Sequence, residues 1–369
     1  MKNMKHLLTL LSAVSLALSL CACRAEAPAA PTEAHSATEL PETSAPATES
    51  TTESTEATEA VPQHRNPLTG EVLSAPLDRR IVSISIGNTA DAMPTHGLPQ
   101  ADIVFEMYVN HLTTRFLALY TDPAAVSAVG SVRSHRYPFT DLSLAYDTIA
   151  AHAGGSGKVI QDANRSGIDH MNIDTSSSTP YSFRDKTRKA NGYPWEHCLF
   201  ASGAGLYDYA ASKDFRTAMD PKKNYGLTFA EGAALTEGQS ANTVTLTFRL
   251  SSSSKKSVMT YNAATGRYEF TQHSSPMLDG NTGEAVAFRN VFVLLADTQT
   301  DADGYHLSDL LGTGEGFFAC DGYLVPILWH RDRDTDPFTF TLADGTPLAQ
   351  GVGSSYIAIA PLDSTVEAQ

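Results

Sequence analysis

The segment from Arg24 to Pro62 most constrains how this chain can fold, because it consists almost wholly of Ala, Thr, Glu, Ser and Pro. Leu40 and Val61 are its only large apolar residues, so it offers nothing from which a hydrophobic core could form. A flexible chain of this length has a root-mean-square reach of roughly 35 Å. We therefore expect a disordered tether over residues 23–62 and a folded region over residues 63–369.

The residues before the tether have the pattern of a lipoprotein signal peptide. Two lysines precede an apolar run over residues 7–20, and small residues then lead to a cysteine. Lipidation requires a small residue before the modified cysteine, which favours Cys23 after Ala22 over Cys21 after Leu20. The alternative is a membrane-spanning anchor, but an apolar run of about 14 residues is shorter than the roughly 20 that a span needs. We predict a signal peptide over residues 1–22, a lipid such as palmitate on Cys23, and attachment to the extracytoplasmic face of the membrane bilayer.

The folded region is acidic. Eight glutamates against Arg24 give the tether a charge of −7, and the two signal lysines add +2, so residues 63–369 carry −10 of the total −15. A domain of this charge is not expected to bind nucleic acid through its overall field. An anion site would have to be a local cluster of basic residues.

A change of composition near residues 231–242 suggests two domains, over residues 63–235 and 236–369. The first mixes elements: the pattern predicts strands over 80–86, 102–109, 114–120 and 148–153, and helices over 137–146 and 158–164. A strand, a glycine-rich turn and a helix in succession are typical of an α/β (α+β) domain.

The second predicted domain is mainly β. Short apolar strands are predicted over 242–250, 257–261, 267–271, 290–295, 322–329, 338–341 and 355–360, separated by Asp-Gly turns. A small sandwich or barrel is expected. The charged run from Arg331 to Asp336 is expected to form a solvated hairpin turn. Cys198 and Cys320 would allow one disulfide without requiring it.

The densest group of basic residues lies in residues 128–137, AVGSVRSHRY. Arg133 and Arg136 could together hold a carboxylate or phosphate through paired N–H donors. The alternative is a pair of surface ion pairs, which would contribute little stability.

His152 ends a predicted strand, where open α/β sheets place ligand sites. It could act as an acid, a base, a hydrogen-bond donor or a metal ligand, or it could be a structural histidine. The GGSGK that follows is not a phosphate loop, because four residues do not separate its glycines and Val159 follows the lysine.

Further candidates are Glu106, Arg115 and the polar segment 184–197, which contains Arg184 and His197 and could instead be an exposed loop. No HExxH, GxSxG or paired CxxC motif is present, and we predict no metal and no cofactor.

Several motifs occur together in a specific order and spacing. They are NPLTG (66–70), GLPQADIVFE (97–106), TRF (114–116), VGSVRSHR (129–136), HAGGS (152–156) and GSSYIAIAP (353–361). In these motifs the chain resembles the YerB-type lipoproteins, a family with a DUF3048 domain followed by a β-rich domain, over most of residues 66–360.

The resemblance implies an extracytoplasmic lipoprotein of unestablished biochemistry. It also implies one site lined by Arg115, Arg133, Arg136, His152, Arg184 and His197, with Glu106 in support. The chain departs from the family at Glu196-His197-Cys198, where a Pro-His-Asn-like element is typical: the histidine carries over and the amide does not.

We expect a binding protein whose Arg/His cluster holds an anionic cell-envelope ligand: a wall peptide carboxylate, the phosphate of a wall polymer, or an acidic envelope protein. One alternative is a cell-wall-modifying hydrolase or transferase in which His152 pairs with Glu106 or Asp147. A second alternative is a structural scaffold that binds partners through sheet edges.

Overall fold

The computed structural model describes residues 63–369. The signal peptide, Cys23 and the tether predicted for residues 1–62 lie outside these described residues. Within residues 63–369, no helix is long and apolar enough to cross a membrane.

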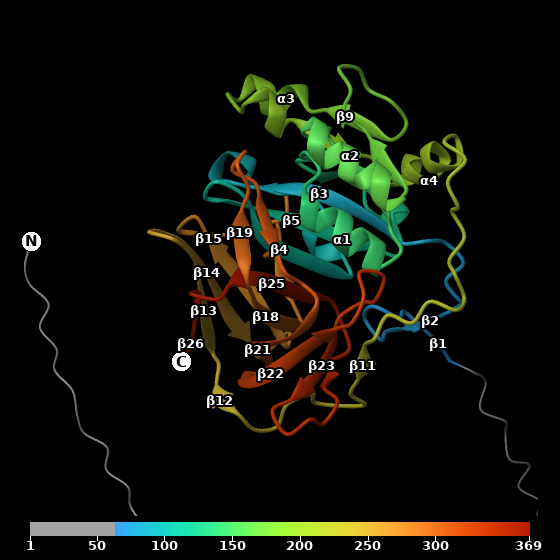
Figure 1. Cartoon of the computed structure of the whole chain (residues 1–369). Coiled ribbons are helices and arrows are strands. Elements are labelled where there is room, and N and C mark those ends of the chain that lie inside the picture. The colour runs from blue at the N-terminus through green and yellow to red at the C-terminus, as the bar shows by residue number, and fades with distance from the viewer. Residues whose placement is uncertain (1–62) are drawn as a thin grey trace, which may run out of the picture. The chain divides into compact units, whose positions relative to one another are not determined.

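The largest sheet has eleven strands and takes strands from both predicted domains (Figure 1). Its strands, in spatial order, are β12 (Gln239–Ser240), β22 (Tyr323–Arg331), β21 (Gly312–Cys320), β18 (Asn290–Ala296), β25 (Ser355–Pro361), β4 (Ile103–Asn110), β5 (Thr113–Tyr120), β3 (Val82–Asn88), β7 (Ile149–His152) and β8 (His170–Asn172), with β23 (Thr339–Leu342) beside β22. The central strands are buried along almost their whole length, as expected for a sheet covered on both faces.

A second sheet of six strands forms the rest of the β-rich half. Its strands are β16 (Ser275–Pro276), β15 (Arg267–Gln272), β14 (Ser253–Asn262), β13 (Thr243–Leu250) and β26 (Thr365–Ala368), with β17 (Ala287–Phe288) beside β15. Burial alternates along β13 and β15, so one face of this sheet is apolar. That face packs on the large sheet: the ring of Tyr356 on β25 lies 4.6 Å from the ring of Phe270 on β15.

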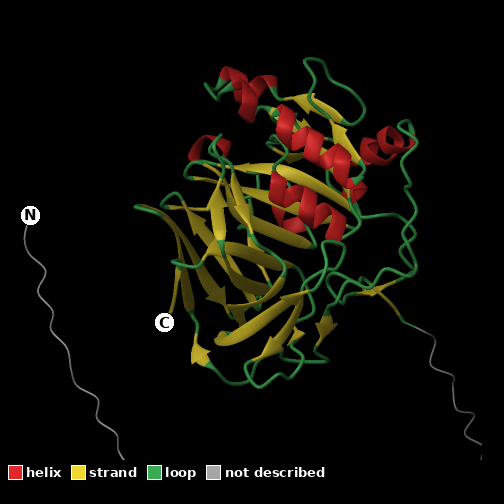
Figure 2. Ribbon diagram, in the orientation of Figure 1, coloured by secondary structure: helices red, strands yellow, loops and turns green. Residues whose placement is uncertain are grey.

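The helices gather at one end of the molecule (Figure 2). They are α1 (Tyr137–Ala145), α2 (Gly157–Ser166), α3 (Lys186–Ala190) and α4 (Gly203–Ala211), with the 3₁₀ turns η1 (Ala90–Ala92), η2 (Leu98–Gln100), η3 (Pro123–Ala125) and η4 (Trp195–His197). The Ser156 hydroxyl accepts from Val159 N at the start of α2, and Gly167 ends it in the left-handed conformation. Helix α1 buries Phe139 and Leu142 against the β4–β5 face of the large sheet.

Short pairings complete the fold. They are β6 (Val129–Gly130) and β9 (Ser182–Arg184) on either side of β10 (Leu199–Ala201); β1 (His64–Arg65) with β2 (Val72–Leu73); β11 (Thr228–Phe229) with β24 (Ala349–Gln350); and β19 (Thr298–Thr300) with β20 (His306–Ser308).

The predicted fold class is confirmed: an α/β N-terminal part precedes a mainly β C-terminal part. The expectation of a separate sandwich or barrel is wrong in one respect, because β25 pairs in parallel with both β18 and β4. One sheet therefore joins the two parts. The boundary at residues 235/236 stays a prediction.

Two further expectations can be compared with the structure. The cysteines Cys198 and Cys320 are both buried and unbridged. Arg331 was expected in a solvated turn, which is wrong: it ends β22 with a fully buried side chain that pairs with Asp141 of α1 at 2.8 Å. The alternating burial of β22 continues to this residue, and the part-buried carboxylate of Asp141 compensates its charge.

Candidate functional site

A small cavity lies where the end of β3 and the start of β5 meet the segment before α1. We call it the arginine cavity; its volume is about 170 Å³ and it is lined by Gly87, Asn88, Thr89, Asn110, Thr113, Arg115, Arg133, Arg136 and His197. Four of the seven residues predicted from the sequence are therefore together here: Arg115, Arg133, Arg136 and His197.

Each arginine comes from a different local context. Arg115 lies on β5, opposite Gly87 of β3. Arg133 lies between β6 and α1, where its backbone N–H donates to Ser85 O at 2.8 Å. A Cβ on Gly87 would lie 3.0 Å from Arg133 Cγ, so glycine allows this close approach. Arg136 is the N-cap residue of α1.

The guanidinium groups donate to neutral oxygens. Arg115 Nη1 donates to Ser134 O at 2.6 Å, Arg136 Nη1 to His135 O at 2.7 Å, and Arg133 Nη1 to Glu196 O at 2.9 Å. Within residues 63–369, none of the three forms an ion pair with a carboxylate. Three positive charges thus converge with no carboxylate at ion-pair distance among the described residues, and the charge of Glu196 acts on Arg133 from farther away.

Electrostatics in the cavity disfavour positive charge. Burial, together with the neighbouring charges of Arg136 and Arg133, lowers the pKa of Arg115 well below its ordinary value. Burial also lowers the pKa of Arg136, and the positive charge of Arg133 adds to this lowering. Arginine remains charged despite such shifts, so the cavity holds positive charge at an energetic cost. Burial and then Arg133 lower the pKa of His197 to about 4, which makes this imidazole neutral at pH 7.

Buried polar atoms around the cavity lack partners in the described part of the chain. They are Asn88 Oδ1, Thr89 Oγ1, Arg115 Nε, Arg136 Nε and His197 Nδ1. Leaving a buried donor or acceptor unpaired costs about 1–3 kcal/mol. An anion with several acceptor oxygens could satisfy both the free donors and the charge.

His152 lies outside the lining of this cavity, in a cluster of histidines. Its Nε2 is 3.0 Å from His170 Nδ1 and its Nδ1 is 2.9 Å from Gly154 O. The ring of His135 lies 5.0 Å from its ring. Burial, followed by the proximity of His170, lowers the pKa of His152 to about 4. Among the described residues, no group of three His, Cys, Asp or Glu is arranged to hold a metal ion.

Neither carboxylate of the acid–base alternative reaches His152. Asp147 forms ion pairs with Arg80 at 3.1 Å and with Arg216. Glu106 is fully buried, and its oxygens accept from Lys255, from Tyr356 Oη at 2.7 Å and from Asn88 Nδ2 at 2.9 Å. Glu106 therefore supports the cavity indirectly, by holding Asn88 in its wall.

Arg184 stands beside the cavity. It forms an ion pair with Asp174 at 2.5 Å, and its guanidinium lies 4.6 Å from the centre of the Trp195 ring. Its Nη1 donates to Trp195 O at 2.7 Å, which fixes η4 and hence His197 at the end of η4. Burial is the main cause of the lowered pKa of Arg133, and the positive charge of Arg184 lowers it further.

The sequence reasoning missed the polar residues of the wall, Asn88, Thr89, Asn110 and Thr113. They flank the predicted strands over 80–86, 102–109 and 114–120, and strand ends are where such residues gather. The missing information was strand order: β5 lies between β3 and β4, and this brings the ends together.

Comparisons with known proteins agree with this fold. The family described as "Protein of unknown function (DUF3048)" matches with its N-terminal domain over residues 68–216 and its C-terminal domain over residues 244–357. The "Putative lipoprotein YerB" of Bacillus subtilis (strain 168) is 26% identical over an alignment of 324 residues, and the match covers 80% of this chain and 88% of the relative. The crystal structure of the YerB protein from Bacillus subtilis superimposes with a TM-score of 0.70 at 25% identity, covering 82% of this chain and 99% of that one.

Both domains of the family match in order, and together they span most of residues 63–369. The similarity to a relative named as a lipoprotein indicates a lipoprotein here as well. This chain belongs to the DUF3048 family of YerB-type lipoproteins.

Proposed function

We propose that this lipoprotein is anchored through lipidated Cys23 at the extracytoplasmic face of the membrane, and that it binds an anionic group of the cell envelope in the arginine cavity. The observation that carries the proposal is the convergence of Arg115, Arg133 and Arg136 without a described carboxylate partner. Arg331 is paired with Asp141, whereas the buried Arg188, outside the cavity lining, has backbone carbonyl partners. What distinguishes the cavity is that three guanidinium groups line it together, two of them on buried residues.

The geometry supports local recognition. The domain as a whole carries −10, so an acidic ligand would be repelled at long range and attracted only at the cavity. Planar guanidinium groups recognise carboxylates and phosphates through paired N–H donors. Neutral His197 can add a further donor or acceptor without adding charge.

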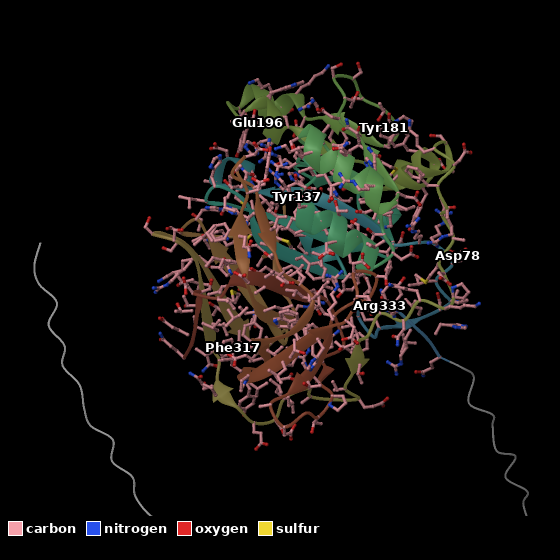
Figure 3. All side chains as sticks on the ribbon, viewed as in Figure 1. Asp78, Tyr137, Tyr181, Glu196, Phe317 and Arg333 are labelled. Carbon is pink, nitrogen blue, oxygen red and sulfur yellow. The ribbon has the colours of Figure 1, made fainter. Side chains whose placement is uncertain are left out.

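The proposal can be tested with soluble protein of residues 63–369 incubated with purified cell wall. We expect the cell wall to retain the wild-type protein, and the Arg133→Gln/Arg136→Gln double variant to remain in the supernatant. The matched control is Arg333→Gln, since Arg333 is exposed, pairs with Asp336, and lies well away from Glu196 (Figure 3). Circular dichroism would verify that all three proteins are folded.

Equal retention of all three proteins would overturn the proposal. Mass spectrometry of the supernatant would detect released wall fragments. Release that His152→Ala abolishes would instead support the hydrolase or transferase alternative.

A further inference from the structure

The arginine cavity adjoins two larger pockets, and we call the three together the trough. The middle pocket, of about 540 Å³, shares Asn88, Thr89 and Thr113 with the arginine cavity. The end pocket, of about 560 Å³, shares Ala90, Gln272 and His273 with the middle one. The shared side chains place the three pockets side by side in this order.

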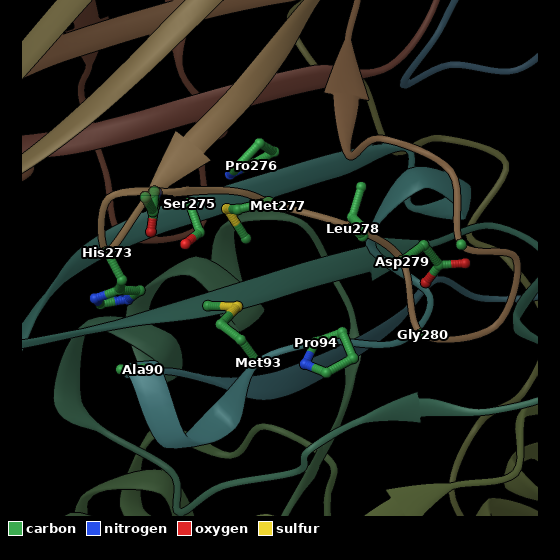
Figure 4. Close-up of a pocket in the computed structure, with 12 residues that line it drawn as sticks. Ala90, Met93, Pro94, His273, Ser275, Pro276, Met277, Leu278, Asp279 and Gly280 are labelled. Atoms are coloured by element: carbon green, nitrogen blue, oxygen red, sulfur yellow. The ribbon is translucent and has the colours of Figure 1, made fainter.

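The chemistry of the walls changes along the trough. The arginine cavity carries three guanidinium groups. Most residues that line the middle pocket carry a hydroxyl, amide or ammonium group, including Thr113, Ser254, Lys256 and Thr271. The end pocket is largely apolar: Figure 4 shows Met93 and Met277 extending toward each other from its two sides, with Pro94, Pro276 and Leu278 around them.

Hydrogen bonds between distant segments hold the trough in shape. At the end pocket, Gly97 N donates to Asp279 Oδ1 at 2.7 Å and Gly280 N donates to Thr95 O at 2.7 Å. In the middle, Gln272 Nε2 donates to Glu106 Oε2 at 2.9 Å. The walls are thus tied to each other in the free protein, which reduces the entropy lost on binding.

We infer that the trough binds an extended peptide with its C-terminal end in the arginine cavity and an apolar side chain in the end pocket. This inference rests on the proposed function and names the class of its ligand. The two carboxylates of a C-terminal acidic residue match a cavity with three guanidinium groups and a neutral His197. Capture of a C-terminal carboxylate is an established mode of peptide recognition.

The middle pocket favours a peptide over an anion on an alkyl chain. A peptide backbone presents an N–H and a C=O at each residue, which the hydroxyl and amide groups of this wall can pair with. An alkyl chain passing here would leave those groups unpaired, at a cost for each. The middle pocket also has no Phe, Tyr or Trp among its lining residues, whereas large aromatic side chains commonly line small-molecule pockets.

The test uses residues 63–369 and fluorescein-labelled Gly/Ser hexapeptides that end in glutamate, with one leucine moved through the upstream positions. We expect binding by fluorescence anisotropy when the C-terminus is a free acid, and loss when it is an amide. Leucine at one or two neighbouring positions should tighten binding by ~10-fold or more over glycine, the effect of burying its side chain.

Two variants separate the two ends of the trough. Leu278→Glu, at a side chain that is 47% exposed and therefore tolerant of substitution, should remove only the gain from leucine. Arg133→Gln/Arg136→Gln should remove binding of every peptide. Arg333→Gln should bind each peptide with the same affinity as wild type.

The outcomes distinguish the inference from the proposed function. If phosphate or glutarate raises the Tm in an arginine-dependent way but no peptide binds, the peptide inference is overturned and the anion site stands. Binding of dodecyl phosphate in preference to inorganic phosphate, without peptide binding, would likewise overturn the inference in favour of a phosphorylated amphiphile. If no anion and no peptide binds, both fail.

Discussion

At the scale of single residues, this protein treats buried charges in two ways. Glu106 and Arg331 are buried with charged partners and several hydrogen bonds, as structural ions are. Arg115 and Arg136 are buried with neutral carbonyl and amide partners and with an unpaired Nε each. Arg188 is also buried with carbonyl partners and an unpaired Nε, outside the cavity lining, so the cavity differs in that three guanidinium groups line it together. A bound anion would offset the cost of that convergence.

The charge of Glu106 should be essential for stability. Burial would raise the pKa of Glu106, but Lys255 and the surrounding donors lower it below its ordinary value, so the carboxylate is ionised. Glu106→Gln should therefore leave the Lys255 ammonium uncompensated and lower the free energy of unfolding by about 3–5 kcal/mol. Urea unfolding would measure this, with exposed Glu237→Gln as the control, for which we expect a change within about 0.5 kcal/mol. Equal stability of both variants would contradict the structural role of the ion pair.

The histidine cluster should make stability depend on pH. His152 has a pKa of about 4 in the fold against 6.5 ordinarily, so the unfolded chain binds the proton more readily. Its contribution is fully present above pH 6.5, and roughly 3 kcal/mol is lost as the pH falls toward 4. Unfolding measured at pH 7 and pH 5 should show a smaller loss for His152→Gln than for wild type.

The comparison of wild type with His152→Gln is needed because Asp102 changes the stability with pH in the opposite direction. Burial raises the pKa of Asp102 to about 6, so its contribution to stability decreases as the pH rises over part of the same range. Both proteins contain Asp102, so its effect cancels when the stability loss of His152→Gln is subtracted from that of wild type. An identical loss in wild type and His152→Gln would show that His152 has no lowered pKa.

At the scale of elements, strand positions could be predicted from the sequence and their neighbours could not. Alternating and continuous apolar runs predicted β3, β4, β5 and β7 to within a few residues. The pairing of β25 with β4 joins residues about 250 positions apart, and no local pattern carries that information.

The candidate site follows the same rule. Three arginines and a histidine could be selected by their local density and by the family motifs. Lys255 could not, because its role depends on β14 lying beside Glu106 in space. The family resemblance groups His152 with the arginines, yet its hydrogen bonds join it to His170 and Gly154 O.

The shared sheet predicts that the N-terminal part cannot fold by itself. A fragment of residues 63–235 lacks β25 and exposes the edge of β4 from Ile103 to Met107. We expect this fragment to aggregate or to lack cooperative unfolding, and co-expression with residues 236–369 to restore a soluble complex. A monomeric fragment with a cooperative thermal transition would contradict this expectation; residues 63–369 serve as the folded control.

At the scale of the whole molecule, the anchor and the cavity have separate tasks. In the proposed function, the lipid anchor determines where the protein is, and the arginine cavity determines which ligand it binds. Because the folded part is acidic overall, binding should depend on the cavity rather than on the general field.

The anchor prediction can be tested with two neighbouring cysteines. Cys23→Ala should move the protein from the membrane fraction to the soluble or secreted fraction, because lipidation is lost. Cys21→Ala is the matched control: it changes a residue of the predicted signal peptide and should leave the protein in the membrane. Immunoblots of fractionated cells would show this, and membrane retention of both variants would contradict lipidation at Cys23.

The most direct test of the account is a thermal-unfolding titration of residues 63–369 with phosphate and with glutarate, at constant ionic strength set with chloride. An anion at about tenfold its Kd stabilises the folded state by ~1.4 kcal/mol, which raises the Tm by a few degrees. We predict this rise for wild type and Arg333→Gln, and its loss in Arg133→Gln/Arg136→Gln. The same Tm change in all three proteins, or none in any, would contradict an anion site in the arginine cavity.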